Sequence, residues 1–335
     1  MRATAAPRAP SPALPPRSAP GAAGTPPHAP EEGRTARLLG PLWVTGVFWY
    51  RIHRWGVRVL PEWALPPATL VFTALFWVLL RRIRAAVASN LEAVLGPCGW
   101  WQRQRRIFRT FHDYAWCVSE RYERLSTAPP VTVEADHPER WRRALASGRG
   151  VILLTAHLGS WEIGSALAGE VGERPVHVVR EEETDPRAQA FIARLLAERM
   201  GPGYHTHFAA GPDPALSITL LGALGRGEAV ALQGDRPRRG GRTVSQTLFG
   251  RPYEIPAGPL VLARSAGVPL VPVFVLREGR LSYRALIDEP IAVAHGPDRA
   301  ADLAAAGALV AAAIEAAIRR RPHQWFCFRR LWPAG

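Results

Sequence analysis

A histidine and a glutamate follow a strongly apolar stretch near the middle of the chain, in VILLTAHLGSWEIG (residues 151–164). A histidine that accepts a proton from a substrate hydroxyl acts as a general base, and a neighbouring carboxylate can fix its tautomer and stabilise the imidazolium. Glu162 is five positions after His157, which is about 140° around a continuous α-helix. The two side chains can therefore meet only if Gly159 and Ser160 form a tight turn between a strand and a helix.

The spacing alone is a weak signal, because His-x4-Glu occurs by chance in many proteins and a surface histidine is the simpler explanation. A serine nucleophile at Ser160 is disfavoured, since its neighbours do not form a Gly-x-Ser-x-Gly elbow. His205 and His207 lie two residues apart in GYHTHF. We interpret them as loop residues and expect no metal site, because no carboxylate or cysteine cluster completes a ligand set. The stretch GDRPRRGGR (234–242) lacks the Gly-Lys-Ser/Thr ending of a P-loop.

The second half of the chain alternates apolar runs with helical stretches, which is typical of an α/β domain. We predict an α/β fold with a mixed central sheet flanked by helices, preceded by an N-terminal hydrophobic helical segment that associates with a membrane. The expected strands are residues 151–156, 176–179, 230–233, 270–276 and 281–287, and the expected helices are residues 185–200, 214–226, 258–266 and 300–321.

The beginning of the chain differs in composition from the rest. Its first 30 residues hold nine of the 32 prolines and show no apolar periodicity, so we expect a disordered tail over residues 1–35. Residues 1–14 lack the apolar stretch of a secretory signal. The three cysteines, Cys98, Cys117 and Cys327, match neither a zinc ribbon nor a disulfide framework, and we interpret them as reduced thiols.

Residues 36–130 are both hydrophobic and basic. The longest apolar run, residues 68–80, is thirteen residues long and is followed by Arg81, Arg82 and Arg84, whereas a membrane span needs roughly 20 apolar residues. An interfacial or half-inserted helix fits this run better, and a core helix of a soluble domain is the alternative. Residues 84–125 predict amphipathic helices with a basic polar face. We therefore divide the chain into a tail (1–35), a membrane-associating helical region (36–130) and a catalytic core (131–335).

The net charge of +14 predicts attraction to polyanions such as nucleic acid, anionic lipid or phosphorylated substrates. All 42 basic residues are arginine, alongside abundant alanine, proline and glycine. This usage indicates coding bias as much as selection for phosphate binding, so charge alone does not choose among these partners.

The motif HLGSWE, with His157 and Glu162 at its ends, resembles the His-x4-Asp/Glu motif of the lysophospholipid acyltransferase superfamily. The resemblance is to the branch of the lipid A late acyltransferases and the phosphatidylinositol-mannoside acyltransferases. It extends over residues 38–332 through RRIRAAVASNLEAVLG (81–96), ALQGDRP (231–237), TLFGRPYEIPAGPLVLARSAGVPLVPVFVLREG (247–279) and RRPHQWFCFRRLW (320–332).

The resemblance implies that His157 removes the proton from an acceptor hydroxyl, which attacks the thioester carbonyl of an acyl donor. Glu162 would orient His157, and no covalent acyl-enzyme is needed. Arg180 and Arg194 follow where the family places arginines that face the substrate, and they would hold phosphate or support the oxyanion. A solvated arginine is the alternative for each.

The resemblance also implies a substrate-binding role for the pair Asp235 and Arg236, in which Asp235 structures the site or supports Arg236. Some residues depart from the family's pattern. Arg236 stands where many relatives have glutamine, Cys327 where an aromatic residue is common, and Arg329 where histidine is frequent. These departures leave the donor and the acceptor open. Pro66 and Pro67 interrupt the hydrophobic segment, which weakens the case for a transmembrane anchor.

The resemblance further implies an acyl carrier protein or acyl-coenzyme A as donor, a lipid A precursor or related glycolipid as acceptor, and no cofactor. We expect the cytoplasmic face of the inner membrane, because acyl thioesters are made in the cytosol and arginines follow the apolar run. Two alternatives stay open. One is an acyltransferase for a phosphatidylinositol mannoside or another lysolipid, and the other is a non-catalytic basic module that binds lipid or nucleic acid, although we expect no nucleic-acid partner.

Overall fold

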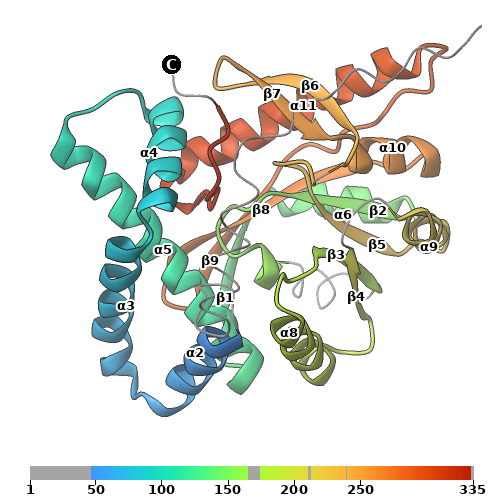
Figure 1. Ribbon diagram of the computed structural model, residues 1–335. Helices are drawn as coiled ribbons and strands as arrows, with labels where there is room; N and C mark the ends of the chain where they lie inside the picture. The colour runs from blue at the N-terminus through green and yellow to red at the C-terminus, as the bar shows by residue number, and fades with distance from the viewer. Residues whose placement is uncertain (1–46, 165–173, 210–212, 239, 333–335) are drawn as a thin grey trace, which may run out of the picture.

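The computed structural model describes residues 47–164, 174–209, 213–238 and 240–332, so the predicted tail lies outside the described residues. Figure 1 shows the arrangement of its elements. The helices are α2 (Val47–Val59), η2 (Glu62–Ala64), α3 (Leu65–Leu79), α4 (Arg81–Leu95), α5 (Trp100–Thr127), α6 (Pro138–Ala146), α8 (Pro186–Arg199), α9 (Pro214–Gly225), α10 (Ala257–Ala266), α11 (Arg299–Arg320) and η3 (Pro322–Gln324). The strands are β1 (Thr132–Asp136), β2 (Val151–Thr155), β3 (Val176–Glu181), β4 (Tyr204–Ala209), β5 (Ala229–Gln233), β6 (Thr243–Leu248), β7 (Arg251–Pro256), β8 (Leu270–Gly279) and β9 (Ser282–Ile287).

Seven of the strands form one sheet in the order β1-β9-β8-β2-β5-β3-β4. Neighbouring strands are parallel, except that β8 and β9 are antiparallel. The predicted α/β fold with a mixed central sheet is therefore confirmed. β2 lies between β5 and β8, and all five of its residues are buried. This explains its uninterrupted apolar sequence, because a central parallel strand is covered on both faces.

Alternate residues of β2 pack into two cores on opposite faces of the sheet. Ile152 and Leu154 belong to a core that includes residues of α9, α10 and α11. Val151 and Leu153 belong to a second core with Trp141 of α6. In Figure 1, α10 and α11 lie above the sheet. The sheet is thus flanked by helices on both faces, as the sequence predicts.

The four helices α2 to α5 lie together beside the sheet, at the left of Figure 1. Pro66 and Pro67 stand in the first turn of α3. They therefore begin this helix, because proline is well tolerated where the backbone N–H has no helical partner. Two helical stretches in the described part of the chain are long and apolar enough to cross a membrane, Glu62–Leu79 and Arg299–Arg320. The 18-residue apolar window is 17% buried in the first and 44% buried in the second. The exposed apolar residues of the first stretch include Leu70, Val71 and Val78.

Two features of the sheet region differ from the sequence prediction. His205 and His207 lie in β4, the edge strand that pairs with β3, and not in a loop. Polar residues alternate along an edge strand, so no apolar run marks it in the sequence. β6 and β7 form a separate hairpin whose turn residues Phe249 and Gly250 have φ values of 52° and 71°. Two consecutive left-handed residues are the geometry of a tight hairpin turn.

Candidate active site

His157 lies just beyond the end of β2, at the start of the turn that the sequence predicts. Its backbone is fixed from two sides. The carbonyl of His157 accepts a hydrogen bond from the Phe326 N–H at 2.8 Å, and the Ser160 N–H donates to the Val275 carbonyl at 2.7 Å. Gly159 has a φ of +60°, and a Cβ there would clash with the Val275 carbonyl oxygen. Only glycine therefore fits this turn without strain.

Asp235 holds the His157 ring. The carboxylate oxygen Oδ1 of Asp235 lies 2.8 Å from Nδ1 of His157, and the Asp235 side chain is fully buried. Its other oxygen, Oδ2, accepts a hydrogen bond from Nε1 of Trp325 at 3.3 Å. Asp235 follows β5, which is parallel to β2. The carboxyl ends of the two strands meet at one edge of the sheet, and this brings together residues that are 78 positions apart.

These surroundings keep His157 in the form that a base requires. Burial lowers its pKa, and the charge of Asp235 opposes this effect. For Asp235, burial disfavours the charged form, but the attraction of His157 holds the pKa of the carboxyl well below its usual range. An ionised carboxylate only accepts hydrogen bonds, so Nδ1 of His157 carries the proton. The lone pair is then on Nε2.

Glu162 is paired with two arginines. Its carboxylate oxygens lie 2.9 and 2.8 Å from Nη1 of Arg121, and it also forms an ion pair with Arg180. Burial disfavours its charge, but the two arginines hold the pKa of Glu162 below its ordinary value. The sequence predicts that Glu162 orients His157. In the structure, the carboxylate bonded to the His157 ring is instead that of Asp235, and Glu162 positions Arg121 and Arg180.

The side chains of His157, Glu162, Arg121, Arg180 and Arg236 line one cavity of about 180 Å³. The remaining lining is largely aromatic and apolar and includes Tyr114, Cys117, Trp161, Phe326 and Phe328. The guanidinium of Arg180 lies over the Trp161 ring, 5.1 Å from its centroid. Burial raises the pKa of Cys117 to about 12, so this thiol stays protonated at neutral pH and is a poor nucleophile.

The structure brings five of the six predicted site residues together, either on the cavity wall or directly behind it. His157, Glu162, Arg180 and Arg236 are on the wall, and Asp235 is behind His157. Arg194 is the exception, because its side chain is exposed on α8 and does not line the cavity. In the described part of the chain, no group of three or more His, Cys, Asp or Glu side chains is arranged to hold a metal ion.

Arg121 is the site residue that the sequence did not reveal. It belongs to α5, in a stretch that has the pattern of a basic amphipathic helix. The available signal was the pair of acidic residues around it, Glu120 and Glu123, which interrupt the basic pattern and are buried. Charged residues are rarely buried without partners. Their positions indicate that this part of α5 faces the protein interior.

A second cavity, of about 160 Å³, adjoins the first at Trp161, which lines both. Its walls are almost entirely apolar. They are formed by Val133, Ala135, Pro138, Trp141, Leu153, Thr155, Gly164, Ala231, Val273, Val275, Ala285 and Ile287, together with Trp161. The two cavities place a polar, positively charged compartment beside an apolar one.

The sequence model of a family described as bacterial lipid A biosynthesis acyltransferase matches residues 35–333. Among solved structures, the chain is similar to the crystal structure of the 1-acyl-sn-glycerophosphate (LPA) acyltransferase PlsC from Thermotoga maritima. The two are 14% identical, the match covers 78% of this chain and 97% of that chain, and the TM-score is 0.35. No curated protein matches the chain.

Proposed function

Because the chain belongs to the bacterial lipid A biosynthesis acyltransferase family, it is an acyltransferase of lipid substrates, and we propose which reaction it catalyses: the transfer of a fatty acyl chain from an acyl thioester to a hydroxyl group of a lipid A precursor or related glycolipid. His157 is the general base. The observation that carries this proposal is the bond from His157 Nδ1 to the buried Asp235, which leaves the basic Nε2 for a substrate in the cavity.

During the reaction, one proton moves from the acceptor hydroxyl to His157 and then from His157 to the leaving group. Nε2 of His157 takes the proton of the acceptor hydroxyl as its oxygen attacks the thioester carbonyl. The tetrahedral intermediate then breaks its C–S bond, and the leaving thiolate takes the proton from the imidazolium. A C–O bond has formed and a C–S bond has broken. Asp235 stabilises the transient imidazolium, and no covalent bond to the protein is required.

The arginines supply positive charge where negative charge develops. Arg121 and Arg180 share one carboxylate, Glu162, so this group of three carries one net positive charge, and Arg236 adds a second at the same cavity. Held by Glu162 and stacked on Trp161, Arg180 is fixed before substrate binds. Fixed charges of this kind stabilise an oxyanion or bind a phosphate group.

The apolar cavity beside Trp161 is suited to the acyl chain. A fatty acyl chain loses contact with water along its whole length when it enters such a space, which stabilises the complex by about 0.8 kcal/mol for each buried CH₂ group. Because Trp161 lines both cavities, a chain in the apolar one ends beside the catalytic compartment. The apolar walls of this cavity support a donor with an apolar acyl group.

The enzyme would bind its donor, an acyl carrier protein or coenzyme A thioester, at the cytoplasmic face of the inner membrane. The exposed apolar surface of α3 supports membrane attachment. Arg81 and Arg82 are exposed directly after this helix, as expected for its cytoplasmic end.

An acyl-transfer assay with purified protein tests the proposal. Radiolabelled acyl carrier protein and coenzyme A thioesters are combined with a lipid A precursor, a phosphatidylinositol mannoside and lysolipids as acceptors. We expect His157→Ala to lower transfer by roughly 10²- to 10⁴-fold, the usual contribution of a general base. His205→Ala is the matched control, because His205 is exposed on the edge strand β4. Transfer that survives His157→Ala in folded protein would contradict the assignment of the base.

A further inference from the structure

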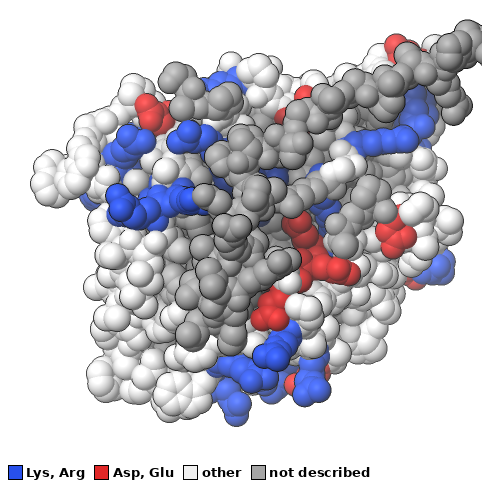
Figure 2. Space-filling model, in the orientation of Figure 1, with Lys and Arg blue, Asp and Glu red and all other residues white. Residues whose placement is uncertain are grey.

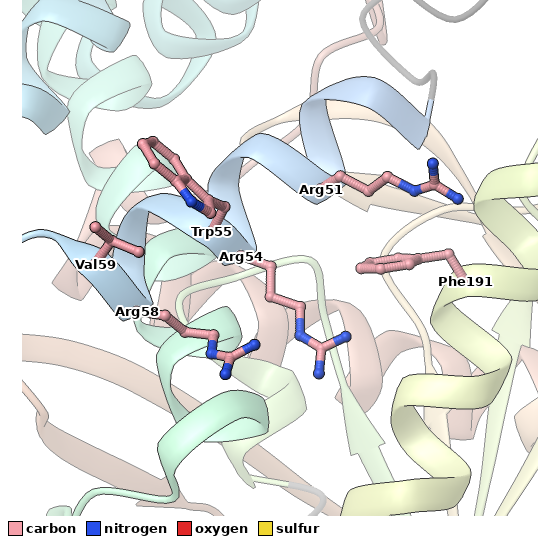
Figure 3. A pocket seen from close by; sticks show the side chains of 6 residues that line it. All are labelled: Arg51, Arg54, Trp55, Arg58, Val59 and Phe191. Carbon is pink, nitrogen blue, oxygen red and sulfur yellow. The ribbon is translucent and has the colours of Figure 1, made fainter.

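Three arginines of α2 line a hollow between this helix and α8. Arg51, Arg54 and Arg58 face this hollow together with Trp55 and Val59 of α2 and Phe191 of α8, and its volume is about 420 Å³. Figure 3 shows the three guanidinium groups on the side of α2 that faces Phe191. Figure 2 shows basic side chains gathered at the lower edge of the molecule, where α2 and α8 lie. We call this hollow the α2 arginine pocket.

The inner face of α2, which packs against the rest of the protein, holds the helix in this orientation. Tyr50 donates a hydrogen bond to Glu183 at 2.9 Å, and Nε2 of His53 lies 2.8 Å from the Ser119 hydroxyl of α5. The rings of Tyr50 and His53 also contact Tyr122. The spacing of Arg51, Arg54 and Arg58 places them within about 60° of one another around the helix. Anchoring the inner face therefore directs all three into the pocket.

In the described part of the chain, none of these three arginines forms an ion pair, and the Nε atom of Arg54 is buried without a hydrogen-bond partner. The guanidinium carbon of Arg54 lies over the Phe191 ring, 5.8 Å from its centroid. A buried donor without a partner costs free energy. The arginine side chains that line the pocket carry charges with which a ligand with several anionic oxygens would pair.

Two acidic residues that contact α2 accept hydrogen bonds there. Glu183 accepts the hydrogen bond of Tyr50, and Asp185 accepts from the backbone N–H groups of Val47 and Arg187. Arg187 and Arg51 line a further hollow beside Val47. Arginine side chains thus continue past the pocket along this side of α2.

The surroundings indicate which anion is bound. Trp55, Val59 and Trp63 are 61%, 57% and 78% exposed, and they connect the pocket to the exposed apolar face of α3. A bilayer surface offers phosphate groups and apolar chains side by side, and tryptophan and arginine are both favoured at its interface. An acidic protein would offer ion-pair partners to the arginines. It would leave the tryptophan rings either exposed to water or packed against polar surface.

We propose that the α2 arginine pocket binds the phosphate of an anionic phospholipid headgroup while Trp55, Trp63 and the outer face of α3 enter the bilayer. The pocket is lined by none of the residues that line the His157 cavity. It is therefore a second lipid contact, which sets how the protein sits on the membrane and takes no part in the chemistry.

Vesicle sedimentation tests this proposal with the full-length protein in the triple variant Arg51→Gln, Arg54→Gln and Arg58→Gln. The probes are vesicles of phosphatidylcholine alone and vesicles of equal parts phosphatidylcholine and phosphatidylglycerol. We expect the variant to lose on the order of 100-fold in affinity for the anionic vesicles, since each arginine near an anionic surface contributes about fivefold. Affinity for phosphatidylcholine should be unchanged, because the apolar face is intact.

The matched control replaces Arg142, Arg242 and Arg299 with glutamine, which removes the same charge from exposed positions on other elements. If both triple variants lose the same affinity for anionic vesicles, binding depends on the net charge of the protein and not on the α2 arginine pocket, and the proposal is overturned. Unchanged binding in the α2 variant would overturn it outright, provided that circular dichroism shows both variants folded.

Purified acyl carrier protein is the third probe. If the α2 variant loses affinity for this acidic protein but not for anionic vesicles, the pocket is a protein-docking site and the lipid proposal is overturned. The proposed acyl transfer is tested separately, because vesicle binding requires no turnover. His157→Ala should bind both kinds of vesicle as well as the unmodified protein.

Discussion

The two carboxylates of the catalytic cavity have different partners. Asp235 is fully buried and contacts the proposed base, at Nδ1 of His157. Glu162 is bonded to two arginines that line the same cavity. A carboxylate next to a histidine controls its tautomer and its pKa, whereas a carboxylate between two arginines fixes their positions and reduces their net charge. Replacing each carboxylate by its amide should therefore give different kinetic results.

Asp235→Asn should lower kcat/KM and shift the acid limb of its pH profile to lower pH. A base is active only when unprotonated, so activity falls as the pH drops below the pKa of His157. Burial already lowers this pKa from 6.5, and the Asp235 charge opposes that effect. Without this charge the pKa falls further, so the acid limb should shift to lower pH. The plateau should fall by roughly 10²- to 10⁴-fold, because the tautomer is no longer enforced. A pH profile of acyl transfer measures both effects.

Glu162→Gln is the comparison for this experiment. Its charge acts on Arg121 and Arg180, so we expect lower activity with an acid limb that stays in place. If the acid limb of the pH profile shifts in Glu162→Gln and stays in place in Asp235→Asn, the roles assigned to the two carboxylates are reversed.

At the scale of single residues, the sequence predicts the base better than its partner. His157 is recognisable because it ends an apolar strand and begins a motif. The bond from Asp235 depends on the pairing of β2 with β5, in which Thr155 stands opposite Gln233. Pairing between distant segments leaves no local trace in a single sequence. Arg121 was missed for a similar reason, since its role depends on how α5 packs against the sheet.

Among the elements, the turn after β2 is the one that aims the base. Gly159 combines a left-handed backbone with close contact to β8. Gly96, at the end of α4, has a φ of +75°, and no atom lies within 4 Å of the position that a methyl group would occupy there. A substitution at Gly159 therefore introduces both backbone strain and a steric clash, whereas a substitution at Gly96 introduces backbone strain alone.

Gly159→Ala should reduce both stability and activity. The new methyl group must push the turn away from Val275, and a displacement of the base by about 1 Å can cost on the order of 100-fold in rate. Gly96→Ala carries backbone strain alone, about 1–3 kcal/mol for a positive-φ, extended conformation that only glycine adopts readily, and should leave kcat unchanged. Urea unfolding and the acyl-transfer assay measure the two effects. Equal behaviour of the two variants would mean that the contact with β8 does not position His157.

The elements that the sequence predicts well are those with a continuous local pattern. The strands around 151–156 and 270–276 and the helix around 300–321 correspond closely to β2, β8 and α11. β4 was missed because its polar residues alternate at a sheet edge. The hairpin of β6 and β7 was missed because Phe249 occupies a left-handed turn position that usually holds asparagine, aspartate or glycine.

For the molecule as a whole, α5 connects the N-terminal helices to the sheet. Glu120 of α5 is fully buried, 2.8 Å from Nε of Arg277, and accepts a hydrogen bond from Tyr283 at 2.5 Å. One turn further along, Glu123 is paired with Arg280. The sequence divides the chain near residue 130, between α5 and β1, and these bonds cross that division. They predict that the two regions depend on each other for stability.

We therefore expect the helices and the sheet to unfold in one transition. Glu120→Ala should lower the free energy of unfolding by about 3–5 kcal/mol, because it leaves Arg277 as a charge without its buried partner. The exposed Glu139→Ala is the control and should leave the midpoint unchanged. Urea unfolding followed by circular dichroism and by tryptophan fluorescence should give coincident curves for the unmodified protein. Curves that separate, with the tryptophan-rich helices unfolding first, would instead establish the N-terminal region as an independent unit that merely rests against the catalytic core.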